Sequence, residues 1–253
     1  MSVLKGALGL IWEYRLPLLR RILPWYVLLL CFLAVGTWLN QSAFATGITE
    51  GGVRGGFFTA FGSTGLLLLV YGLSAAALAV LWHRMVLNND ELPITWATWG
   101  RYLWAVILIA LALLLVVGVP WMILQFTVGS LFMSRQNFEA VGLALYLLAA
   151  FFTFLGHLLW LRWGLTLPAA AYGDWELTMT DSIEATGDYA WPITVLAILL
   201  TAFQFVVPTV NASMVETLVV GELLFLIPTL IGLSALTWLY RETGVTPKAG
   251  ANP

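Results

Sequence analysis

The chain has 253 residues, of which 61% are hydrophobic and 9% are charged, and its formal net charge is −2. A soluble domain carries about 25% charged residues, so this composition excludes an ordinary water-soluble fold and predicts an integral membrane protein. The small net charge argues against nucleic acid as a partner, because nucleic acid is bound by basic surfaces. Cys31 is the only cysteine, which excludes a disulfide framework.

Six stretches are apolar enough to cross a bilayer as helices, since about 20 residues rising about 1.5 Å each span a hydrocarbon core of about 30 Å. They lack the alternation of polar and apolar residues that a β-barrel strand shows. We therefore predict an all-α, six-helix membrane bundle in one domain, 1–241, followed by a disordered tail, 242–253. The expected spans are 22–39, 57–82, 102–124, 140–161, 191–210 and 217–240.

Basic residues set the expected orientation, because they accumulate on the cytoplasmic side of inner-membrane proteins. With the N-terminus inside, nine of the eleven lie on the cytoplasmic side and only Arg54 and Arg135 lie outside. Both termini are then cytoplasmic. Tryptophans mark the inner end of every span, as an aromatic belt would. They are Trp25, Trp82, Trp104, Trp160, Trp191 and Trp238.

The even-numbered spans end in similar sequences: LWHR at Arg84, LWLR at Arg162 and WLYR at Arg241, spaced by 78 and 79 residues. An amphipathic stretch suited to an interfacial helix precedes each odd span. These stretches are 8–21, 94–101 and 179–188. We predict three copies of one unit, an interfacial helix followed by a hairpin of two spans. The alternative is that every helix end facing the cytoplasm collects Trp and Arg without duplication.

Two segments, LWHRMVL over 81–87 and RWGLTLPAAAYG over 162–173, resemble an uncharacterised group of bacterial multipass inner-membrane proteins. That group carries W-H-R-x-V-L after one helix and R-x-x-L-x-L-P-A-x-A-x-G after a later one. It is loosely similar to the membrane part of glycerophosphodiesterases. The resemblance covers about the middle half of the chain and departs from the group at 88–91, where NNDE replaces a small residue and a single acid. It implies the bacterial inner membrane and a helical fold, but no activity.

Arg84, Arg162 and Arg241 are candidate ligands for an anion or a lipid headgroup, because each follows tryptophan at the inner boundary. The alternative is snorkelling to headgroups without a specific role. Pro168 is expected to break or kink the fourth span near Arg162. Small residues at four-residue spacing predict that the second span packs closely within the bundle. They are Gly72, Ala75, Ala76 and Ala79.

Asp181, Glu184 and Asp188 are spaced i, i+3, i+7, which places three acids on one side of a helix. Such a helix is repelled by anionic lipid unless a basic partner covers it. We regard these residues as a candidate docking surface for another membrane-protein complex. The alternative is an acidic face in contact only with water.

Glu222 and His157 are candidate polar residues inside spans. Glu222 lies near the outer end of span six, where a carboxylate can still reach water, and a transporter would need paired acids at mid-membrane. His157 lies about 6 Å deeper than His83, which makes shared axial ligation of a haem awkward and favours packing for both histidines. Gln204, in span five, adds little support for transport.

Enzyme signatures such as HExxH, GxSxG, GxGxxG and the P-loop are absent from the sequence. We therefore expect no catalysis, no cofactor and no metal. The leading hypothesis is a non-enzymatic accessory or scaffold component of a membrane complex. A carrier or binder of lipid or another amphiphile is the first alternative, and an ion-coupled transporter is the second. The expected partners are membrane lipids and another membrane-protein complex, with no nucleic acid.

Overall fold

The computed structural model describes residues 2–32, 34–36, 69–87, 95–133, 138–173, 176–206 and 214–244. This part of the chain is helical and contains no strand, which confirms the all-α prediction. Five helical stretches are long and apolar enough to cross a membrane, which supports a multipass membrane protein. They are Arg15–Gly36, Leu69–Val86, Trp96–Val128, Gly142–Tyr172 and Gly187–Phe205.

Each of the first five predicted spans overlaps one of these stretches, although 37–39, 57–68 and 207–210 lie outside the described residues. The sixth predicted span, 217–240, falls within the 29-residue helix α10 (Met214–Glu242). The count of six membrane crossings stays a prediction. The tail beyond 244, Arg54 and Arg135 also lie outside the described part of the chain.

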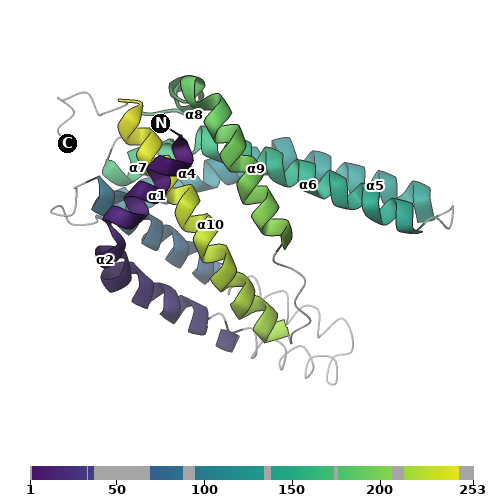
Figure 1. The fold of residues 1–253 in the computed structure, drawn as a ribbon, viewed down its shortest axis with the longest axis horizontal. Helices are drawn as coiled ribbons and strands as arrows, with labels where there is room; N and C mark the ends of the chain where they lie inside the picture. The colour runs from purple at the N-terminus through teal and green to yellow at the C-terminus, as the bar shows by residue number, and fades with distance from the viewer. Residues whose placement is uncertain are drawn as a thin grey trace.

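The first helix is α1 (Val3–Glu13). Ser2 caps its N-terminus by accepting a hydrogen bond from the Lys5 amide. After Tyr14 the chain continues through α2 (Arg15–Pro17) and η1 (Leu18–Ile22) into the first long apolar helix. Val3, Ala7 and Leu10 are buried, and α1 lies across α10 (Figure 1). The predicted boundary of an amphipathic helix over 8–21 is therefore wrong, because the break comes at Tyr14.

The second hairpin starts at α4 (Trp96–Leu113), capped by Thr95, and runs through η2 (Leu114–Gly118) into α5 (Val119–Met133). Residues 96–101 are thus not a separate interfacial helix but lead directly into the span, and Ile94 lies outside the described residues. η2 is a turn of π-helix, and Pro120 explains it. Proline has no amide hydrogen to donate to the carbonyl one turn earlier, and next to it the Val119 amide donates five residues back, to the carbonyl of Leu114.

The chain returns along α6 (Phe138–Trp163), turns, and forms the short helix α7 (Thr166–Tyr172). Pro168 is the third residue of α7, where an amide needs no partner within the helix, so the predicted break occurs just before it. Gly173 ends α7 with a φ of 109°, a left-handed conformation that favours glycine. Then α8 (Met179–Ala185) and η3 (Gly187–Tyr189) precede α9 (Ala190–Val206), so within the described residues a separate amphipathic helix is seen in the first and third units.

The buried core lies at one end of the bundle, where the helices Leu69–Val86, α6 and α10 end against α1 and α7. Away from this end α5 and α6 project in one direction and α10 in another, with α9 between them (Figure 1). Apolar side chains are widely exposed on the diverging helices, as expected where lipid is the solvent.

The tryptophans of the predicted aromatic belt differ in exposure between the odd and the even spans. Trp25, Trp104 and Trp191 are 61%, 61% and 73% exposed. Trp82 and Trp238, by contrast, are buried in the core. Tryptophans at the ends of even helices therefore serve packing, and those at the starts of odd helices face outward.

Close packing in the core depends on glycines that the sequence pattern does not single out. A Cβ built on Gly6 would meet the indole ring of Trp238, and one built on Gly232 would lie 2.8 Å from the ring of Trp160. In the second span Ala76 and Ala79 are buried, but Gly72 is exposed with no atom near a built Cβ. The predicted small-residue contact is thus confined to the inner half of that helix.

Candidate functional site: a cavity between α6, α9 and α10

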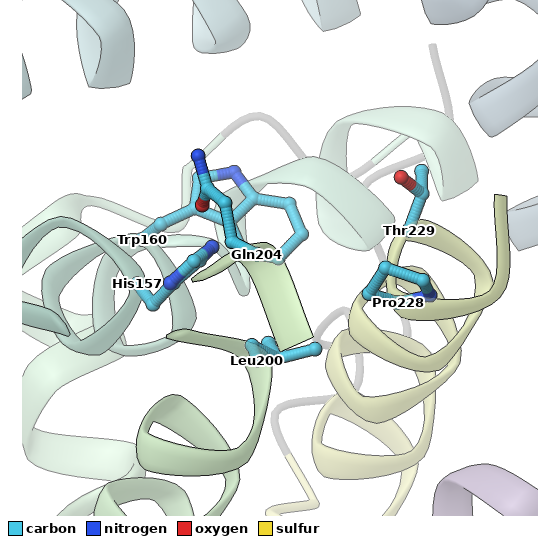
Figure 2. Close-up of a pocket in the computed structure, with 6 residues that line it drawn as sticks. All are labelled: His157, Trp160, Leu200, Gln204, Pro228 and Thr229. Carbon is cyan, nitrogen blue, oxygen red and sulfur yellow. The ribbon is translucent and has the colours of Figure 1, made fainter. Parts of the chain in front are cut away.

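A cavity of about 240 Å³ lies between α6, α9 and α10 (Figure 2). α6 packs along α9, whereas α10 makes few contacts with either helix, so a gap remains between them. Pro228 of α10 lines this gap. Its neighbours in the wall are His157, Trp160, Leu200, Gln204 and Thr229. α6 and α9, which form two of its walls, belong to helical stretches that are long and apolar enough to cross a membrane.

His157 is held in one orientation by α9. Its Nδ1 lies 3.1 Å from Thr201 Oγ1, and the same hydroxyl donates a hydrogen bond of 2.8 Å to the carbonyl of Ala197. A hydroxyl has a single proton, which Thr201 has already donated to the backbone. In this arrangement Thr201 accepts from His157, and on that basis we assign the imidazole proton to Nδ1.

The other ring nitrogen, Nε2, then carries a lone pair and is a hydrogen-bond acceptor. It makes no hydrogen bond within the described residues, and the ring nitrogen farther from the backbone points toward Gln204 and Trp160 (Figure 2). The cavity wall therefore presents a fixed acceptor from His157. The Gln204 amide, the Thr229 hydroxyl and the Trp160 indole supply further polar groups among the apolar surfaces of Leu200 and Pro228.

His83 forms the same kind of pair in the core. Its Nδ1 lies 2.8 Å from Thr237 Oγ1, which itself donates to the Leu233 carbonyl at 2.8 Å. His83 is fully buried, lies tilted against the ring of Tyr102 with the ring centroids 5.9 Å apart, and does not line the cavity. The two histidines thus share a hydrogen-bonding pattern, but only His157 offers its free nitrogen to an open space.

The three arginines proposed as an inner rim have different surroundings. Arg84 is only 4% exposed, because the end of its helix lies inside the core, so its guanidinium does not belong to an exposed rim. Arg162 donates from Nη2 to the Ile183 carbonyl at 2.9 Å and thereby holds α8 against the end of α6. Arg241 is exposed near the end of α10. They do not form one exposed set.

The acidic residues do not share one helical face. Asp181 is the third residue of α8 and forms a capping box with Thr178, accepting from the Thr178 amide at 2.9 Å. This and the hydrogen bond from the Thr178 hydroxyl hold the pKa of Asp181 below its ordinary value. Because α8 ends at Ala185, Asp188 falls in η3, and the predicted i+7 alignment is wrong. Glu184 and Asp188 are exposed.

Glu222 belongs to α10, but its side chain lies outside the described residues. Sequence reasoning missed Thr201, Trp160 and Thr229 as site residues and gave Gln204 little weight. The bond between His157 and Thr201 joins positions 44 residues apart, and no local pattern signals it. Comparison of the chain with protein-family models, curated proteins and solved structures finds no match, so the resemblance drawn from its two segments stays a prediction.

Proposed function

We propose that this chain is a non-enzymatic membrane protein that binds an uncharged amphiphile in the cavity between α6, α9 and α10. The observation that carries the proposal is the fixed lone pair of His157 Nε2 at the wall of an otherwise largely apolar cavity. An unmet acceptor in a lipid-facing site favours a ligand that donates a hydrogen bond, such as a hydroxyl or an amide.

The size of the cavity supports an amphiphile over a compact solute. Sites that enclose a whole small molecule have volumes of about 300–1,000 Å³. At about 240 Å³, this cavity suits the polar head of a lipid and its first methylene groups. The acyl chains would continue between α6 and α10, which make few contacts with each other.

The test compares a ligand that has a free hydroxyl with one in which that hydroxyl is capped. Native mass spectrometry of the protein in a nanodisc or mild detergent is carried out with a diacylglycerol and with its O-acetylated derivative. We expect the free hydroxyl to bind about two- to tenfold more tightly, the range that one neutral hydrogen bond supplies. His157→Phe should abolish this preference, and Ser74→Ala, in a separate cavity near Trp25, should retain it. Equal binding of both ligands by the unmodified protein would contradict the proposal.

An accessory role in a membrane complex is the second candidate, and one observation favours it. Arg162, the basic side chain that contacts α8, donates to a backbone carbonyl and leaves the carboxylates of Glu184 and Asp188 exposed. A basic partner could therefore dock there. Changing both acids to Gln and Asn should release a partner that co-purifies with the unmodified protein. Retention of the partner would count against docking at this surface.

A further inference from the structure

A second cavity, of about 350 Å³, lies between α4 and α7 beside the segment that leads into α8. Arg101, Ala105 and Leu108 line it along one face of α4, at the i, i+4, i+7 positions of that helix. Thr166 and Ala170 of α7 form the opposite wall, with a short segment closing one end. That segment is Leu177, Thr178 and Met179. We call this cavity the Arg101 groove.

Arg101 is exposed and makes no hydrogen bond or ion pair within the described part of the chain. This distinguishes it from Arg162, which is bonded to α8, and from Arg84, which is buried. An arginine presents five N–H donors that match the oxygens of a phosphate. The groove therefore has an unused anion ligand at one end and aliphatic walls along the rest of its length.

Tryptophans indicate the depth of Arg101 relative to the membrane. Trp104 is 61% exposed, and Trp96, two turns earlier in the chain than Trp104, is 85% exposed and packs edge-on against Trp99. Exposed tryptophans collect at the level of the lipid headgroups. Arg101 lies between them on α4, so we expect it at the level of the lipid phosphates, with Leu108 farther along the groove on the side expected to face the hydrocarbon region.

We infer that the Arg101 groove binds an anionic phospholipid from the adjacent leaflet, with the guanidinium on the headgroup phosphate and an acyl chain along Ala105 and Leu108. Charge complementarity identifies the occupant, since a cation without a partner stands at one end and the remaining walls are mostly aliphatic. The short side chains of Ala105 and Ala170 leave the space that the chain occupies. This site is independent of the cavity at His157, because it lies on different helices and selects a charged ligand.

The test is native mass spectrometry of the full chain in detergent with added phosphatidylglycerol or phosphatidylcholine. We expect retention of phosphatidylglycerol over phosphatidylcholine, and Arg101→Gln should weaken phosphatidylglycerol binding about fivefold, the effect of one arginine facing an anionic headgroup. Arg241→Gln is the matched control, since Arg241 is exposed but lies outside the groove. Ala170→Leu fills the groove without changing charge and should also reduce binding.

Three results would overturn the inference. Equal losses in Arg101→Gln and Arg241→Gln would show a general effect of charge, and unchanged binding in Ala170→Leu would show that no acyl chain enters. Competition by inorganic phosphate at millimolar concentration would identify a site for the free anion. Because Arg101→Gln changes a side chain without a partner, its thermal unfolding midpoint should equal that of the unmodified protein, which separates lost binding from lost structure. The diacylglycerol preference attributed to His157 should persist in this variant.

Discussion

Replacing Gly6 by alanine tests how α1 is held in the bundle. The Cβ of alanine would overlap the indole ring of Trp238, whereas a Cβ on Gly9, one turn later in the same helix, meets nothing within 4 Å. Trp238 cannot easily withdraw, because it is buried and packs edge-on against Tyr189 at a ring distance of 5.7 Å.

The pair of variants isolates the effect of the contact. Each Gly→Ala change gains about 1 kcal/mol of helix propensity. Forcing an extra carbon into a close-packed site costs about 1–3 kcal/mol. Because the propensity gain is common to both, Gly6→Ala should be less stable than Gly9→Ala by about 1–3 kcal/mol.

The assay is reversible unfolding in mixed micelles, followed by near-ultraviolet circular dichroism. Combining Gly6→Ala with Trp238→Phe should recover part of the loss, because the smaller ring leaves room for the methyl group. The reasoning is refuted if Gly6→Ala proves as stable as Gly9→Ala.

Three further predictions concern the cavity and α8. Thr201→Val removes the acceptor for His157 Nδ1–H, so it should lower the affinity for diacylglycerol. Thr194→Val is the control on the same helix, because Thr194 has no histidine partner, and it should leave the affinity unchanged. Calorimetric titration in nanodiscs measures both affinities. Leu200→Trp should fill the cavity and block binding while Arg101-dependent lipid retention persists, which native mass spectrometry reports. The lowered pKa of Asp181 means that its cap stabilises α8 above the ordinary value of 3.8 and that this contribution is lost as pH falls through the lowered pKa. The rate of amide exchange in α8 of the unmodified protein should therefore rise, relative to the rate in Asp181→Asn, as the pH falls. A ratio of the two rates that stays constant with pH would contradict the assignment.

Composition and hydropathy predict the class of this fold because lipid imposes them directly. Uninterrupted apolar runs of about 20 residues have no soluble alternative, so the helical spans follow from the sequence. A local signal also succeeds, since Pro168 correctly predicts the end of α6. The cap that Thr178 forms with Asp181 was not predicted, although its sequence is that of a capping box.

Contacts between distant segments could not be predicted in this way. The burial of Arg84 and Trp82 depends on the packing of α1 and α10 around the end of their helix, which no local pattern encodes. The sequence favours a packing role for His157. Its bond to Thr201 depends on the register of α6 against α9, which the sequence does not reveal. The open cavity likewise results from the divergence of α10, a tertiary feature.

Histidine-selective ¹⁵N labelling tests the central proposal most directly, because the chain contains only two histidines, His83 and His157. Spectra of the protein in nanodiscs should show both rings neutral with the proton on Nδ1. Titration with diacylglycerol should shift the Nε2 resonance of His157 and leave that of His83 unchanged, with no shift on adding the O-acetylated lipid. A His157 resonance that does not respond, or one protonated on Nε2 before ligand is added, would contradict the account.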